Sequence, residues 1–212
     1  MKNLTLSGKN LLIYRIIFAA LSWFTFITSP IVYAVIYGRP FLEWFNSFIA
    51  FTIQTNSIIT IWFTLAILWH NKPESLSKIM GPLKGAFTMY ITITFVVFAI
   101  LLSPFYQPTG WAAFSNLVLH YITPIAFIID WILTEIQMQY KWNYLLYWMI
   151  YPLCYIIFAV IYGTITGNYI YYFFDINTLG IPGFFMSVSI LIAFGIALGC
   201  LYIWINRKRI RK

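Results

Sequence analysis

Two short polar clusters interrupt apolar stretches of this chain, and both carry groups that could do chemistry. The first is F-T-I-Q-T-N, residues 51–56, in which Thr52 and Asn56 lie four positions apart with Thr55 beside them. The second is N-L-V-L-H, residues 116–120, which ends in His120, the histidine embedded in an apolar run. Residues four apart on a helix share a face, so each cluster would present its polar groups together.

A hydroxyl, an imidazole and several amides are the components of a nucleophilic site. A hydroxyl becomes a useful nucleophile when a base accepts its proton, and histidine suits that task because it titrates near neutral pH. The amides of Gln54, Asn56 and Asn116 could donate to a developing oxyanion. The alternative interpretation is structural, because Thr, Gln, Asn and neutral His side chains also form hydrogen bonds between membrane helices.

The composition indicates that these clusters lie inside a membrane. Hydrophobic residues make up 62% of the 212 residues and charged residues 8%, against about 25% charged residues in soluble domains. The net charge is +8, and the basic residues gather beside the ends of apolar runs. That placement favours anionic lipid headgroups at the cytoplasmic face as partners, rather than nucleic acid. Cys154 and Cys200 lie in apolar runs without disulfide or metal-type spacing, so we expect packing roles, and neither a metal nor a cofactor.

The apolar runs predict an all-α integral membrane protein, a bundle of six transmembrane helices forming a single domain over residues 1–212. The first run is too long for a signal peptide, so we expect it to remain as a span. The predicted spans cover residues 11–37, 41–69, 85–103, 111–133, 144–165 and 183–205, with an aqueous segment at 70–84 and a loop at 166–182. Arg39 is the one basic residue on its side of this topology, which puts both termini in the cytoplasm.

This topology places the two polar clusters at one depth. Thr52 is eleven residues past Phe41, and His120 is nine past Trp111, so on helices both lie roughly 14–16 Å below the outer ends of their spans. The sequence therefore predicts that Thr52 and His120 meet. Asp130 is ten residues beyond His120 and too far to orient it, so we expect it to pair with a basic residue or a tyrosine. The other four acidic residues fall in or next to loops, where we expect them to be solvated: Glu43, Glu74, Glu135 and Asp175.

Three motifs in order carry a resemblance that covers nearly the whole chain. They are F-T-I-Q-T-N at 51–56, N-L-V-L-H at 116–120 followed by Pro124, and T-G-N-Y-I-Y-Y-F at 166–173. With these motifs the chain resembles the androgen-induced-protein family of six-span membrane proteins and its shorter bacterial relatives. The resemblance implies a multi-pass protein of a bacterial plasma membrane.

Animal members of that family are intramembrane threonine hydrolases that cleave fatty acid esters of hydroxy fatty acids. By resemblance, the nucleophile falls on Thr52 and the histidine on His120, with Thr55 as a rival nucleophile. The chain departs from the family at Tyr172, where a proline is expected, and at Pro124, which is displaced by one position. These departures bear on the lid and the substrate more than on the threonine–histidine pair.

The aromatic segment within the third motif supplies the candidate lid or substrate-lining residues: Asn168, Tyr169, Tyr171 and Tyr172. An interfacial aromatic belt is the commoner role of such a segment. The functional hypothesis is thus an intramembrane lipid-ester hydrolase acting on fatty-acyl esters. The alternative is a non-catalytic lipid-binding or small transport protein that uses the same polar level as a binding site.

Overall fold

The computed structural model describes residues 8–71, 73–135 and 138–210, and the side chains of residues 73–80 lie outside that description. Across these residues the chain is helical and contains no strand. Six helices are long and apolar enough to cross a membrane, which confirms the predicted all-helical membrane class: Gly8–Val35, Phe51–Leu68, Gly81–Phe105, Gly110–Thr134, Tyr144–Thr166 and Ile176–Ile210.

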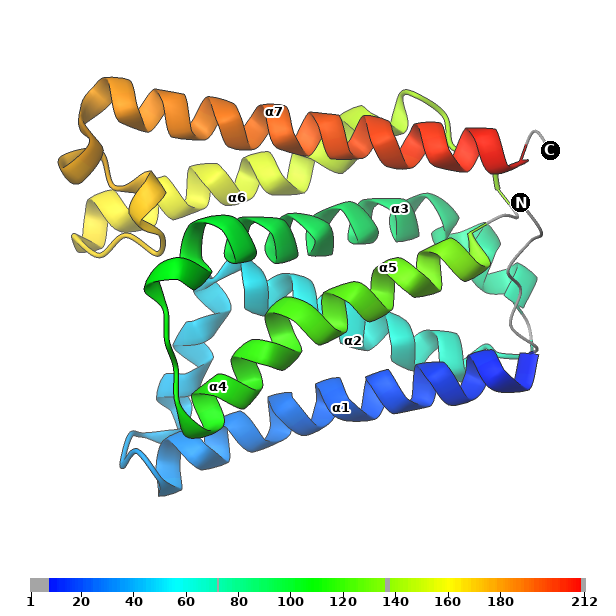
Figure 1. The fold of residues 1–212 in the computed structure, drawn as a ribbon, viewed down its shortest axis with the longest axis horizontal. Helices are drawn as coiled ribbons and strands as arrows, with labels where there is room; N and C mark the ends of the chain where they lie inside the picture. Colours follow the sequence, from blue (N-terminus) through cyan, green and yellow to red (C-terminus); the bar gives the residue numbers. More distant parts are fainter. Residues whose placement is uncertain (1–7, 72, 136–137, 211–212) are drawn as a thin grey trace. The chain divides into compact units, whose positions relative to one another are not determined.

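The chain groups into two compact units, Met1–Met138 and Gln139–Lys212, which are coloured blue to green and green to red in Figure 1. The first unit contains α1 (Gly8–Val35), η1 (Phe41–Ile49), α2 (Phe51–Leu68), α3 (Pro73–Val97), η2 (Phe98–Leu102), η3 (Ser103–Phe105), α4 (Gly110–Leu117), η4 (Val118–Ile122) and α5 (Thr123–Thr134). The second contains α6 (Tyr144–Thr166), η5 (Tyr172–Phe174) and α7 (Ile176–Ile210). The single domain over 1–212 stays a prediction.

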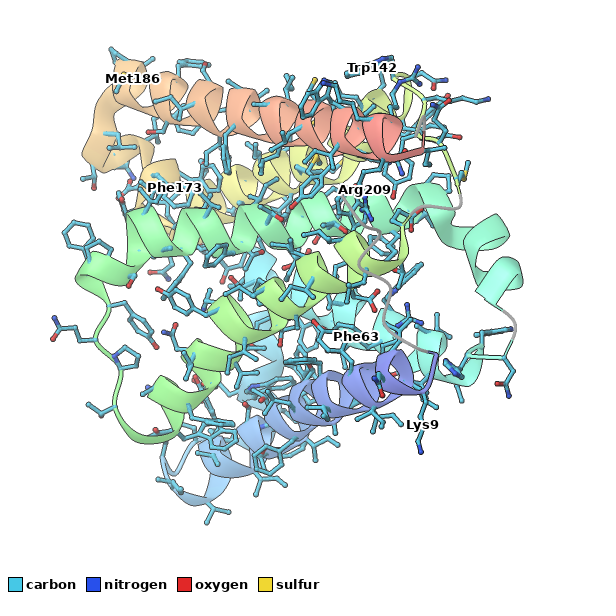
Figure 2. All side chains as sticks on the ribbon, turned by 45° about the vertical axis from the view of Figure 1, so that its right-hand side comes forward. Lys9, Phe63, Trp142, Phe173, Met186 and Arg209 are labelled. Atoms are coloured by element: carbon cyan, nitrogen blue, oxygen red, sulfur yellow. The ribbon has the colours of Figure 1, made fainter. Side chains whose placement is uncertain are left out.

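The core of the first unit forms where α1, α2, α3 and α5 meet. Phe63 of α2 and Phe127 of α5 are fully buried and pack edge to face, with ring centroids 5.5 Å apart. Figure 2 shows Phe63 inside this group of helices. Large apolar side chains such as Ile17 and Leu68 point outward instead, as expected of helices that face lipid.

The second predicted span is not one continuous helix from residue 41 to 69. Residues Phe41–Ile49 form a 3₁₀ helix, and Ala50 is extended (φ −79°, ψ 135°), so α2 begins only at Phe51. The turn is held by Gln54, whose Nε2 donates to the carbonyl of Phe48 at 2.7 Å. Trp44 anchors the 3₁₀ helix by packing against Phe26 of α1. As a result, Thr52 is the second residue of a helix rather than a position deep within one.

Two residues predicted to be aqueous are buried. The segment 70–84 enters helix α3 at Pro73, and Lys84 at its end is 3% exposed. Glu135, expected to be solvated, is also buried. Lys84 is drawn inward because a buried carboxylate lies within reach, as described below. The prediction for the Glu74 side chain falls outside the described residues.

The last span begins earlier than predicted. Helix α7 starts at Ile176 rather than near residue 183, because Asp175 caps it by accepting the backbone N–H groups of Asn177 at 2.9 Å and Thr178 at 3.2 Å. A break at Gly180, whose φ of 65° suits glycine, precedes Pro182 and divides the helix. The glycine and proline marked a helix start in the sequence but form a kink in the structure.

Candidate active site

Thr52 and His120 meet in the first unit, as predicted. Thr52 Oγ1 lies 3.2 Å from His120 Nε2, and the threonine is 9% exposed. The other ring nitrogen, Nδ1, lies 3.2 Å from the backbone carbonyl oxygen of Asn116. A neutral imidazole protonated at Nδ1 donates to that carbonyl, which leaves Nε2 to accept the threonine O–H. The hydrogen-bond geometry therefore assigns the tautomer that a general base requires.

A π-turn positions the histidine. In η4 (Val118–Ile122) the N–H of Thr123 donates to the carbonyl of Val118, one residue further back than in an α-helix. In this register the carbonyl of Leu119 would receive an N–H from residue 124, but Pro124 has none. The side-chain amide of Asn56 donates to that carbonyl instead, at 2.9 Å.

Asn56 thereby fixes the two halves of the site to each other. The same Nδ2 also donates to the carbonyl of Thr52 at 2.9 Å, so one amide bridges the backbone of the nucleophile candidate and the backbone beside His120. Asn56 is fully buried, and its Oδ1 has no hydrogen-bond partner within the described ranges. Sequence analysis proposed this amide as an oxyanion donor, but the structure places it in a positioning role.

A second π-turn supplies a residue that sequence analysis missed. In η2 (Phe98–Leu102) the N–H of Ser103 donates to the carbonyl of Phe98, and Pro104 follows, the same arrangement as before Pro124. The Phe98 ring stacks on the His120 ring with centroids 3.7 Å apart and an interplanar angle of 22°. Phe98 is buried, so it covers one face of the imidazole. The sequence signal that could have indicated Phe98 is the proline after each turn, because Pro104 and Pro124 lie twenty residues apart.

Thr55 does not meet the histidine. Its hydroxyl pairs with that of Thr94 on α3 at 2.9 Å and lies 2.9 Å from the carbonyl of Phe51, to which it donates in the helix. Thr55 is 1% exposed. The geometry favours Thr52 over Thr55 as the hydroxyl that a base can activate, and Thr94 is a partner that sequence spacing did not indicate.

The side-chain amides of Gln54 and Asn116, also predicted as oxyanion donors, have different roles in the structure. The Gln54 amide closes the turn between η1 and α2 and is not aimed at the histidine. Asn116 orients His120 through its backbone carbonyl, not its side chain. Its side-chain Oδ1 is buried and, within the described part of the chain, has no hydrogen-bond partner.

The N-terminus of α2 offers oxyanion donors that sequence analysis did not propose. Thr52 and Ile53 occupy the first turn of α2, whose cap at Ala50 provides no side-chain hydrogen bond. Backbone N–H groups in a first turn have no intrahelical partner, and the helix dipole favours negative charge there. The candidate nucleophile therefore sits among amides suited to an anion.

Asp130 pairs with basic residues, as predicted, and it pairs with two of them. Its carboxylate lies 2.8 Å from Arg15 Nε of α1 and 2.6 Å from Lys84 Nζ of α3, while Thr134 hydrogen-bonds Lys84. Arg15, Lys84 and Asp130 are 7%, 3% and 0% exposed. The ion cluster ties three helices together, and Lys84 was missed because it was assigned to the end of the aqueous segment 70–84.

The candidate lid residues lie in the second unit. Tyr169 packs on α6 so closely that a Cβ at Gly163 would lie 2.2 Å from its ring. Tyr171 stacks on Phe173, with centroids 5.0 Å apart, and both Asn168 and Tyr172 are exposed. These contacts describe an ordered aromatic turn after α6. The lid role and the interfacial-belt role both stay predictions.

A cavity of about 660 Å³ lies in the first unit between α1, η1 and α4. Ile53, Ser115 and Leu119, which are next to Thr52, Asn116 and His120 in sequence, contribute to its wall. Thr52 and His120 themselves do not line it. The wall of the cavity thus includes sequence neighbours of the threonine–histidine pair but not the pair itself.

Among the described residues no three His, Cys, Asp or Glu side chains lie together as a metal site. Comparison with known proteins finds no family model, no curated protein and no solved structure that matches this chain. The resemblance to the androgen-induced-protein family therefore rests on the three motifs, and the case for a function rests on the geometry above.

Proposed function

We propose that this chain is an intramembrane lipid-ester hydrolase with Thr52 as nucleophile and His120 as base. The observation that carries the proposal is the hydrogen-bonded array from Thr52 Oγ1 to His120 Nε2 and from His120 Nδ1 to the carbonyl of Asn116, with 3.2 Å in each step. A nucleophile, a base and a group that orients the base form the arrangement typical of covalent acyl transfer.

The reaction follows from this array. Thr52 Oγ1 attacks the ester carbonyl carbon, and its proton moves to His120 Nε2. The tetrahedral intermediate collapses, and the leaving alcohol takes that proton, so the acyl group remains as an ester of Thr52. A water molecule, deprotonated by His120, then attacks the acyl-threonine. When this second tetrahedral intermediate collapses, the bond to Thr52 Oγ1 breaks, His120 returns the proton to Oγ1, and the fatty acid is released. Stacking of Phe98 on His120 keeps water from one face of the imidazole and holds its plane.

The oxyanion of each tetrahedral intermediate forms beside Thr52. The backbone N–H groups of Thr52 and Ile53 are the donors best placed by sequence position, because they lie in the first turn of α2. Side-chain amides are weaker candidates, since those of Gln54 and Asn56 donate to backbone carbonyls. Asn116 remains the one predicted amide whose side chain is not used in this way.

The substrate class is a fatty-acyl ester that enters from the membrane. The resemblance suggests fatty acid esters of hydroxy fatty acids, and the six apolar helices favour a lipid substrate over a soluble one. Anionic headgroups are proposed as partners of the basic residues near the helix ends. Arg15 and Lys84 make no contribution to that attraction, because both are buried against Asp130.

The test is hydrolysis of a fluorogenic acyl ester and of a branched fatty-acid ester by detergent-purified protein. Thr52→Ala and His120→Ala should each lower kcat by at least about 10²-fold, and the double variant should be scarcely worse, because the two residues act as a unit. Thr55→Ala is the matched control and should retain most activity. Absence of turnover by wild type would end the hydrolase proposal, and full activity of His120→Ala would refute this mechanism.

The alternative is a non-catalytic lipid-binding protein. The observation in its favour is that the cavity is not lined by Thr52 or His120. Under that hypothesis the wild type cleaves neither ester. The amount of lipid that co-purifies with the protein should fall when cavity-lining residues are substituted, and it should not fall when Thr52 is substituted.

We also propose that both termini face the cytoplasm of a bacterial cell. Six spans put the two termini on one side, and the basic tail that includes Arg207, Lys208 and Arg209 favours the cytoplasmic side. A reporter enzyme fused after the last residue should be active in the cytoplasm, and one inserted near Pro108 should be active outside. The opposite pattern would overturn the orientation.

A further inference from the structure

The cavity between α1, η1 and α4 is rich in hydroxyl groups. Half of the sixteen residues that line it carry one: Thr25, Ser29, Tyr33, Tyr37, Ser47, Tyr106, Thr109 and Ser115. Its volume of about 660 Å³ is within the range of small-molecule sites, about 300–1,000 Å³. A chamber meant only for acyl chains would have an apolar wall, so this lining indicates a ligand with polar groups of its own.

The charge of the lining indicates that those polar groups are neutral. Arg39 is the one charged residue of the wall, and its Nη1 lies 2.9 Å from Oε1 of Glu43. The carboxylate neutralises the guanidinium and would repel a carboxylate or phosphate placed beside it. This pair therefore adds no net charge to the cavity wall that would attract an anion.

One hydroxyl among these residues, that of Ser47, has no hydrogen-bond partner inside the described ranges. Its Oγ is a buried atom, and Ser47 is one of the residues that line the cavity. Three phenols of the wall interact with one another: burial, and then Tyr33 and Tyr37, raise the pKa of Tyr106. A buried polar atom without a partner costs free energy that a ligand hydroxyl could recover.

Three aromatic rings without hydroxyls also line the wall, those of Phe26, Trp44 and Trp111. Trp44 packs edge to face on Phe26, with centroids 6.2 Å apart, and forms an apolar cluster with Leu119. Trp111 donates through Nε1 to Ser29 Oγ at 3.3 Å, which fixes its ring in the wall. Indole and phenyl faces beside hydroxyls suit the C–H faces and O–H groups of a polyol, while the cluster suits the first carbons of an attached chain.

We propose that this cavity binds the neutral, polyhydroxylated headgroup of an acyl or alkyl lipid, either a glycerol or a sugar. The proposal rests on the cavity alone and holds whether or not Thr52 is a nucleophile. If the chain is a hydrolase, the wall of the site includes Ile53 and Leu119, which are next to Thr52 and His120 in sequence.

The experiment measures equilibrium binding of tritiated 1-O-octadecylglycerol to the protein in phosphatidylcholine nanodiscs, with empty nanodiscs subtracted. The ether linkage cannot be hydrolysed, so the result is independent of catalysis. We expect saturable binding of one molecule per chain. Ser47→Ala and Tyr106→Phe each remove one hydroxyl and should weaken binding about 2- to 10-fold, the value of one hydrogen bond. Tyr147→Phe, which removes an exposed phenol outside the cavity, should leave binding unchanged.

Competitors separate the possible ligands. Octadecyl glucoside displacing the label better than unlabelled alkylglycerol would assign a sugar headgroup, and the reverse would assign glycerol; either supports the proposal. Stearate displacing the label better than both would overturn it, because the ligand would then be an anion. Binding that is not saturable, or that is unaffected by both Ser47→Ala and Tyr106→Phe, would also overturn it. Ser47 makes no side-chain hydrogen bond within the described ranges, so its loss should not prevent folding.

Discussion

Removing the carboxylate of Asp130 should destabilise the first unit more than removing either of its basic partners. In the wild type the charges of Arg15, Lys84 and Asp130 sum to +1. Asp130→Asn keeps the shape of the side chain but leaves two buried cations, a sum of +2. Lys84→Met or Arg15→Met leaves one ion pair and a sum of zero. The order of stability follows from these sums, because an unpaired buried charge is the costly species.

The magnitude can be estimated from the burial of the cluster. All three residues are less than a tenth exposed, so solvent screens the interactions little. Breaking a buried pair by removing one partner costs about 3–5 kcal/mol, and here two cations lose their partner, so we expect the upper end of that range. At about 2–4 °C per kcal/mol, the thermal midpoint of Asp130→Asn should fall by roughly 10–20 °C.

The assay is thermal unfolding of detergent-purified protein followed by circular dichroism. Each variant is measured at low salt and at 0.5 M NaCl, where a buried cluster should change little. A triple variant with apolar residues at all three positions should be close to wild type, since replacing a buried ion network as a whole is often neutral or stabilising. The reasoning is refuted if Asp130→Asn unfolds within a few degrees of wild type, or if Lys84→Met is the less stable of the two.

Two further predictions concern the second unit. Gly163→Ala places a methyl group 2.2 Å from the nearest carbon of the Tyr169 ring and should cost about 1–3 kcal/mol of folding free energy. In thermal unfolding, the added substitution Tyr169→Ala should recover most of that loss. A loss that the second substitution does not recover would show that the strain lies elsewhere. The hydroxyl of Thr178, and then two backbone N–H groups, hold the pKa of Asp175 below its ordinary value. Because the pKa of Asp175 is lowered in the folded protein, its ionised carboxylate stabilises the fold. This stabilisation is complete above the ordinary pKa of about 3.9 and is lost as the pH falls through the folded pKa. The difference in thermal midpoint between wild type and Asp175→Ala should therefore be constant from pH 7 to about 5 and narrow below about pH 4, and a difference that widens with acid would contradict this.

Much of the fold follows from the sequence because a membrane permits few alternatives. Apolar runs of about twenty residues must become helices that satisfy their own backbone, so the six spans could be counted. The meeting of Thr52 with His120 was also predictable, since polar side chains at membrane depth gather together. Their positions along straight helices were a poor guide to how they meet, because the break at Ala50 and the π-turn at Val118–Ile122 both change the local rise.

What escaped prediction depends on contacts between segments far apart in the sequence. Lys84 follows a polar stretch, and nothing local shows that Asp130, forty-six residues later, draws it inward. Phe98 is one of twenty phenylalanines, and its stacking on His120 exists only because two helices bring their π-turns together. The bridging role of Asn56 depends on a carbonyl that Pro124 leaves free in a different helix.

The π-turn in η4 also absorbs one residue without changing the angular phase of the helix that follows. A π-turn holds one residue more than the α-helical turn it replaces, and each residue turns an α-helix by about 100°. Deleting one residue within Val118–Ile122 would therefore convert the turn to α-helix and leave α5 in nearly the same phase relative to α4, whereas a deletion in a regular turn of α5 before Asp130 would rotate that residue by about 100°. Asp130 would still face Arg15 and Lys84 after the deletion in η4. The extra residue thus belongs to the site and not to the ion cluster, so its deletion should impair His120 and spare the fold.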